Sequence, residues 1–241
     1  LNRLLGEVIA TGSRCIIANH NLHSLYVFQR DSKMRDFYRQ ADYIHVDGMA
    51  MVLLGKLLGL PLKRKHRVTY ADWVYKIMEE AACNQWRVFY LGSKPGIAEK
   101  GAIVLRHQYP DLQIKTAHGY FDATTDSTDN IPIVNAINAY RPHILFVGMS
   151  MPRQEHWILD NLEQLKVNVL LPSGAAIDYV SGCVPTPPRW AGRWGLEWLF
   201  RLVAEPKRLW QRYLFEPWFL LKVFLISAVQ RRFLPSREND R

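Results

Sequence analysis

Short apolar runs alternate along this chain with longer stretches of helical periodicity, and no other feature constrains the fold as strongly. The apolar runs predict strands at residues 15–18, 43–46, 88–91, 112–116, 144–147 and 167–171. The intervening periodicity predicts helices at residues 22–40, 49–58, 70–82, 131–140 and 153–162, and another that Pro95 opens at its first turn. Strands that alternate with helices indicate an α/β fold, a Rossmann-like and largely parallel sheet with helices on both faces.

Polar and glycine residues follow the predicted strands. In folds of this kind, ligands bind outside the carboxyl ends of the strands. Those ends carry Asn19, Asp47, Gly92, Gly148 and Ser173. We therefore expect the functional site at this edge of the sheet.

The composition changes after residues 185–188, a Pro-Thr-Pro-Pro sequence. The net charge is +9, and the segment from Pro185 onward holds eleven Lys and Arg against five Asp and Glu, together with many tryptophans. We expect an α/β catalytic domain at residues 1–188 and a basic, Trp-rich helical appendage at residues 189–241. No stretch reaches the ~18–20 apolar residues that a spanning helix needs, so we expect this appendage to lie on an anionic membrane surface.

Four segments contain candidate site residues, each with a structural alternative. Asp47 follows a strand and precedes Gly48, which suits a general base, or equally the N-cap of the next helix. The loop at Gly92 suits phosphate binding at a helix N-terminus, or is an ordinary turn. Gln154 lies in the first turn of a predicted helix, where hydrogen-bond donors suit a ligand, whereas Glu155 beside it equally suits a first-turn partner of the helix dipole. Arg67 suits a phosphate contact, or belongs to a solvated basic loop.

Metal and cofactor sites are not predicted. No D-x-D carboxylate pair follows a strand, and no H-x-x-x-H pair occurs. Cys15, Cys83 and Cys183 lie far apart, and we expect them to be reduced core residues of a cytosolic protein. No complete dinucleotide-binding fingerprint is present.

An ordered set of short motifs runs through the chain from about residue 15 to about residue 213. The set comprises Asp47-Gly48, Arg67-Val68-x-x-x-Asp72, Leu91-Gly92-x-Lys94-Pro95, Gly119-Tyr120-Phe121, Pro152-x-Gln154-Glu155, Gly195-Leu196-Glu197-Trp198-Leu199-x-Arg201-Leu202, Pro206 and Arg208. Each motif alone is weak, but the ordered set is specific. The chain resembles the WecG/TagA/CpsF glycosyltransferases, glycosyltransferase family 26.

This resemblance implies an inverting, metal-independent transfer of a sugar from a UDP-sugar to a polyprenyl-diphosphate-linked saccharide in cell-surface polysaccharide synthesis. By similarity, Asp47 matches the catalytic base and Asn19 lies in the segment that lines the donor pocket. Further matches to substrate-contacting residues are Arg67, Gln154, Arg201 and Arg208, the last two on a C-terminal appendage that completes the site near the membrane. The resemblance implies a cytoplasmic protein, peripheral on the inner face of the cell membrane.

Three positions depart from the family pattern. Tyr70 stands where a glycine is expected, and residues 173–176 are less glycine-rich than expected. Gln211 stands where a third arginine is expected, with Arg212 beside it.

A nucleotide- or nucleic-acid-binding protein that uses the basic C-terminal segment is the alternative, because Arg and Trp together can bind single strands. The long apolar runs beside the tryptophans favour lipid, so we expect no nucleic-acid partner. The sequence leaves open the sugar (an N-acetylmannosamine type, glucose or a uronate) and whether the chain forms a homo-oligomer.

Overall fold

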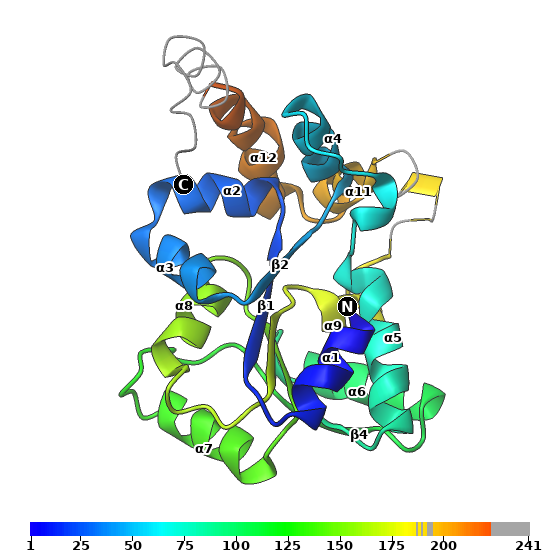
Figure 1. Cartoon of the computed structure of the whole chain (residues 1–241), viewed down its shortest axis with the longest axis vertical. Coiled ribbons are helices and arrows are strands. Elements are labelled where there is room, and N and C mark those ends of the chain that lie inside the picture. Colours follow the sequence, from blue (N-terminus) through cyan, green and yellow to red (C-terminus); the bar gives the residue numbers. More distant parts are fainter. Residues whose placement is uncertain (187, 189, 192–194, 223–241) are drawn as a thin grey trace, which may run out of the picture.

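Six parallel strands form one sheet at the centre of the computed structural model (Figure 1). The structure describes residues 1–186, 188, 190–191 and 195–222, apart from the side chain of Arg208. The strands are β1 (Cys15–His20), β2 (Tyr43–Val46), β3 (Arg87–Gly92), β4 (Gln113–Ala117), β5 (Ile144–Gly148) and β6 (Val169–Pro172). Their order in the sheet is β2-β1-β6-β5-β3-β4, and every neighbouring pair is parallel, which confirms the predicted α/β class.

Helices connect the strands and cover both faces of the sheet. They are α1 (Asn2–Ala10), α2 (Leu22–Arg30), α3 (Ser32–Gln40), α4 (Met49–Leu57), α5 (Tyr70–Cys83), α6 (Ile97–Gln108), α7 (Asn130–Tyr140), α8 (Arg153–Asn161), α9 (Ala176–Val180), α11 (Glu197–Ala204), α12 (Pro206–Leu214) and the 3₁₀ turn η1 (Arg64–His66). Residues 216–222 are also helical.

Two hydrophobic clusters, one on each face, hold the sheet and helices together. Ile144 and Phe146 of β5 join the cluster with α1, α5, α6 and α9, while Leu145 and Val147 join the cluster with α3, α7 and α8. This alternation follows from the two-residue period of a strand. A parallel sheet buried on both faces needs the continuous apolar runs that predicted it.

The predicted helix over residues 22–40 is wrong, because it is two helices. Asp31 interrupts it with an extended backbone (φ −122°, ψ 116°), and its carboxylate accepts a hydrogen bond from the Met34 N–H at 3.0 Å. The apolar period continues across the break, which hides it from a periodicity argument, but the Asp-Ser pair is a typical helix start.

Two smaller expectations also need correction. The helix after β3 begins at Ile97, with Gly96 at its N-cap in the left-handed region (φ +82°), and not at Pro95. All three cysteines are free, yet only Cys15 is buried, whereas Cys83 and Cys183 are exposed.

The C-terminal helices lie against the α/β domain near the carboxyl ends of β1 and β2. Glu197 accepts a hydrogen bond from Arg67 at 2.5 Å, and His23 Nδ1 lies 2.8 Å from a Glu216 carboxylate oxygen. Within the described ranges, no helix has both the length and the apolar character to cross a bilayer.

Candidate functional site

The site forms at the carboxyl ends of β1 and β2, where the chain leaves the sheet toward α4. Asn19 pairs with His45 between these two strands, and the Asp47 N–H donates to the His20 carbonyl oxygen at 2.8 Å. Asn19 is buried, and its Oδ1 has no hydrogen-bond partner among the described residues. A buried amide oxygen without a protein partner costs free energy, so Asn19 Oδ1 is a candidate hydrogen-bond acceptor for a substrate group.

Asp47 is half-buried, and its carboxylate does not cap the helix that follows. Gly48 (φ +86°) occupies the N-cap of α4, and in the described part of the chain no side chain caps this helix. Burial raises the pKa of Asp47 to about 6, and the negative charge of Glu197 also raises it. The positive charges of Arg201, Arg67 and Arg212 act in the opposite direction and lower this pKa. Asp47 is therefore a carboxylate held among arginines, able to exchange a proton near neutral pH.

Arg67 reaches the site along the edge of β2. It forms an isolated parallel bridge with Val46, and the Val68 N–H donates to the Val46 carbonyl oxygen at 2.9 Å. Its guanidinium is mostly buried in an ion pair with Glu197 of α11. The alternative of a solvated loop therefore does not hold for Arg67, although Lys63, Arg64 and Lys65 before it are exposed.

Two more arginines come from the C-terminal helices. Arg201 of α11 lies over the Tyr179 ring, with its guanidinium carbon 5.7 Å from the ring centroid, and its buried Nε has no partner in the described ranges. Arg212 of α12 lies 3.5 Å from Asn21 Oδ1 and acts electrostatically on Asp47. These guanidinium groups can stabilise an anion beside Asp47.

Buried neutral groups border the site on its α8 side. Gln154 donates to Glu155 Oε1 at 2.7 Å and accepts from the Gly174 N–H at 3.1 Å. Glu155 Oε2 and the buried hydroxyl of Tyr70 have no partners among the residues that the structure describes. Burial raises the pKa of Glu155 to about 8, against the lowering effects of the Gln154 hydrogen bond and of Arg212.

Tyr70 lies within the electrostatic influence of both Asp47 and Glu155. It is 6% exposed, and its ring packs near His45, Trp73 and Phe146. Burial raises its pKa, and Asp47 and Glu155 raise it further. The residue that departs from the family's expected glycine thus places a hydroxyl in the interior of the site.

The loop at Gly92 lies farther along the same edge of the sheet, because β5 and β6 separate β3 from β1. A Cβ on Gly92 would come within 2.4 Å of the Gly148 carbonyl oxygen, so this close approach of two strand ends requires glycine. Ser93, beside it, donates to Asp178 at 2.6 Å. Phosphate binding at this loop stays a prediction.

The structure thus brings Asn19, Arg67 and Arg201 together with Asp47 at the β1 and β2 end of the sheet edge, while Gln154 lies on the same edge at the end of β6. Arg208 belongs to α12, but its side chain lies outside the described residues. Sequence reasoning missed Arg212, Tyr70 and Glu155 as site residues. Their signals were weak: Arg212 stood beside an expected arginine, and Glu155 looked like a first-turn dipole partner.

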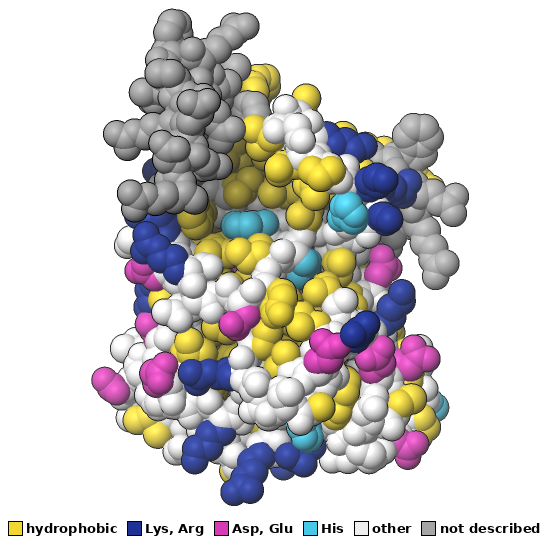
Figure 2. Space-filling model, in the orientation of Figure 1, with side chains coloured by type: hydrophobic (Ala, Val, Ile, Leu, Met, Phe, Trp, Pro, Cys, Tyr) yellow, Lys and Arg dark blue, Asp and Glu magenta, His cyan; other side chains and the backbone are white. Residues whose placement is uncertain are grey.

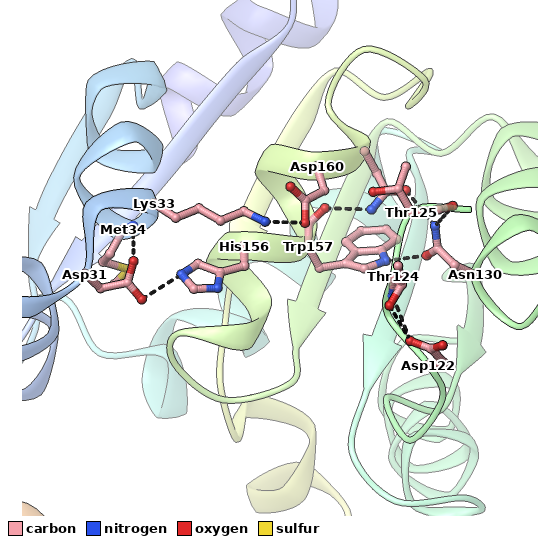
Figure 3. Close-up of polar contacts among 11 residues, drawn as sticks. Asp31, Lys33, Met34, Asp122, Thr124, Thr125, Asn130, His156, Trp157 and Asp160 are labelled. Atoms are coloured by element: carbon pink, nitrogen blue, oxygen red, sulfur yellow. Dashed lines mark hydrogen bonds and ion pairs between the residues drawn. The ribbon is translucent and has the colours of Figure 1, made fainter. Parts of the chain in front are cut away.

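A separate hollow of about 580 Å³ is lined by residues of α3, of α8 and of the segment 123–125. Lys33 pairs there with Asp160 at 2.6 Å, and His156 lies 3.0 Å from Asp31 (Figure 3). Lys33 and His156 each lie against an acidic residue, and Arg153 donates to the Phe121 carbonyl oxygen, so we assign these contacts to holding α8 against α3 and the neighbouring loop. Within the described ranges, no group of three or more His, Cys, Asp or Glu could hold a metal ion.

The sequence is similar to those of known proteins. The glycosyl transferase WecG/TagA/CpsF family matches residues 1–233. Among curated proteins, the chain is 25% identical to the N-acetylglucosaminyldiphosphoundecaprenol N-acetyl-beta-D-mannosaminyltransferase of Staphylococcus aureus strain NCTC 8325. The match covers 81% of this chain and 78% of that protein, and the same values hold for the proteins of strains COL and MRSA252. The chain, with a strand-end carboxylate held among arginines, belongs to the WecG/TagA/CpsF family of glycosyltransferases.

Proposed function

We propose that this glycosyltransferase moves a sugar from a UDP-sugar to a polyprenyl-diphosphate-linked saccharide, with inversion and without a metal ion. The observation that carries the proposal is the Asp47 carboxylate, which caps no helix and lies among three arginines. The reaction needs both a base and a cationic site, and this geometry supplies the two together.

Asp47 acts as the general base. The acceptor hydroxyl attacks the anomeric carbon from the face opposite the leaving group, and its proton passes to the Asp47 carboxylate. The bond between the anomeric carbon and the diphosphate oxygen breaks with its electron pair on the UDP.

Arginines stabilise the departing UDP. Arg201 and Arg212 both lower the pKa of Asp47, which supports a role for their charges beside the reacting atoms. The positive charges of these arginines can balance the negative charge of the diphosphate without a metal ion. The resemblance predicts that Arg208 also contacts the diphosphate. Arg67, which is held by its ion pair with Glu197, contacts the substrate as well.

The remaining polar groups bind the donor. Asn19 and Gln154 line the sugar and nucleotide pocket, and the Gly92 loop lies where backbone N–H groups suit phosphate. Tyr70 and Glu155 contribute a hydroxyl and a carboxyl that stays protonated below pH about 8. These neutral donors suit sugar hydroxyl or acetamido groups.

Residues 189–241 form a membrane-associating appendage, so that the enzyme acts as a peripheral protein on the inner face of the cell membrane. Exposed apolar side chains on the described part of this segment support the proposal, including Val203 at 75% and Trp218 at 70% exposure. We propose an anionic lipid surface and no nucleic acid as its partner.

A donor screen tests the function. Purified protein is incubated in EDTA with a panel of UDP-sugars and a short-chain polyprenyl-diphosphate N-acetylglucosamine, and UDP release is measured. UDP-N-acetylmannosamine is the first donor to test, because the Staphylococcus aureus relatives are named for that sugar and that acceptor. UDP-glucose and a UDP-uronate follow. Acceptor-dependent UDP release from one donor supports the proposal, and a strict requirement for added Mg²⁺ or Mn²⁺ contradicts its metal-independent part.

A further inference from the structure

Four leucines of α4 and the turn after it face solvent although they are large and apolar. The exposed fractions are 56% for Leu53, 79% for Leu57, 46% for Leu58 and 52% for Leu60. Single exposed leucines are common on soluble proteins, but a contiguous apolar patch marks an interaction surface. We call these four residues the leucine ridge.

The local fold holds the leucine ridge in place. A Cβ on Gly55 would lie 2.2 Å from Leu62 Cδ1, so the missing side chain at position 55 lets the following turn fold back on α4. The Leu60 N–H then donates to the Gly55 carbonyl oxygen at 2.9 Å. The result is a small hairpin whose inner side holds Val52 and Gly55 and whose outer side carries the leucine ridge.

Positive charge lies beside the leucine ridge. The sequence has no Asp or Glu between Asp47 and Asp72, while Lys56 and residues 63–65 supply four exposed cations. Figure 2 shows hydrophobic side chains gathered over this end of the molecule, with Lys and Arg beside them. An anionic bilayer offers the matching pair of surfaces, acyl chains for the leucines and phosphate for the cations.

The C-terminal helices present a second apolar surface at the same end of the molecule. Figure 1 shows α4 and α12 there together. The exposed fractions are 43% for Trp210, 50% for Leu214, 62% for Phe215 and 70% for Trp218. A bilayer is extended enough to contact both surfaces at once, and Trp side chains suit its interfacial layer.

We propose that the leucine ridge docks on an anionic lipid bilayer, as a membrane contact separate from the C-terminal segment. Because α4 begins two residues after Asp47 and a nine-residue helix is about 14 Å long, docking would hold Asp47 close to the headgroup layer. A lipid-linked diphosphate would lie in that layer. This consequence rests on the proposed function, whereas the docking itself does not.

Vesicle binding by the full chain tests the proposal. The test variant is Leu53→Ser with Leu57→Ser, and the matched control is Ile103→Ser with Ile131→Ser, where the side chains are 58% and 48% exposed on α6 and α7. Vesicles contain phosphatidylglycerol and phosphatidylethanolamine. We expect the partition coefficient of the test variant to fall about tenfold or more, and that of the control to stay within about twofold of wild type.

Activity measurements separate this proposal from the proposed function. Transfer to an acceptor analogue without the polyprenyl chain should stay within about twofold of wild type in the test variant, while transfer to the lipid acceptor in vesicles falls. If the wild type transfers no sugar but the test variant still loses vesicle binding, the function is wrong and the docking stands. Wild-type vesicle binding by the test variant would overturn the docking. The docking would also be overturned if the test variant changed its sedimentation coefficient but kept wild-type vesicle binding. That result would assign the leucine ridge to contacts between copies of the chain.

Discussion

Burial and charge act in opposite directions on the Asp47 carboxylate, and the balance sets the pH at which it can accept a proton. Its pKa is raised to about 6, with Glu197 among the causes. A base must be ionised, so kcat/KM should fall about tenfold for each pH unit below about 6 and level off above it. Glu197→Gln removes a negative charge and frees Arg67, and should move this limb to lower pH. An unchanged limb in Glu197→Gln would show that another group limits the rate.

Glu155 provides a stability test at the same scale. Its pKa is raised from 4.5 to about 8 by burial, so the folded protein holds a proton that the unfolded chain releases. The free energy of unfolding should therefore decrease as pH rises from about 4.5 through about 8. Glu155→Gln removes this dependence, and its Tm should exceed that of wild type at pH 9 but match it at pH 4. Parallel Tm curves across this range would mean that Glu155 is ionised in the folded protein.

The candidate residues differ in how far the sequence could predict them. Asp47 was predictable, because a strand end in a parallel sheet faces the ligand edge whatever the side chains around it. It was not predictable that the Asp47 carboxylate leaves the following helix uncapped, because this depends on Gly48 occupying the N-cap position of α4. The ion pair of Arg67 with Glu197 joins residues 130 positions apart, and no local pattern indicates such a contact.

At the scale of elements, α12 supplies an arginine one position after the expected one. Neighbouring helix positions point about 100° apart, so only one of Gln211 and Arg212 can face the site. Arg212 is half-buried and acts on Asp47, whereas Gln211 is exposed. Arg212→Ala should lower kcat/KM with a soluble acceptor by on the order of 10²-fold, and the matched Gln211→Ala should stay within about twofold. Equal effects of the two substitutions would remove Arg212 from the site.

Strands and the longer helices followed from periodicity, because a buried parallel strand needs an uninterrupted apolar run. The break at Asp31 did not, since apolar residues continue at helical spacing on both sides of it. The five-residue α9 is too short for periodicity to detect, and tertiary contacts with α6 and α5 hold it in place.

At the scale of the whole molecule, the core lies within the α/β domain, whereas the site also takes residues from the C-terminal helices. Both hydrophobic clusters are complete by Val180, while Arg201 and Arg212 come from the C-terminal helices. A protein ending at residue 188 should unfold cooperatively in a thermal melt. It should also lose transfer to a soluble acceptor by about 10³-fold or more, because the diphosphate loses its cations. Full activity of the truncated protein would leave the C-terminal segment with a membrane role alone.

Turnover of Asp47→Asn measures the central claim most directly. The amide keeps the shape of the side chain but cannot accept the proton, so kcat should fall by on the order of 10²–10⁴. Binding of the UDP-sugar, followed by calorimetry, should change little. Removing a carboxylate whose pKa is raised by burial should also stabilise the folded protein by about 1–3 kcal/mol at pH 8 and hardly at pH 4. A folded Asp47→Asn protein that turns over at nearly the wild-type rate would contradict the assignment of Asp47 as the base.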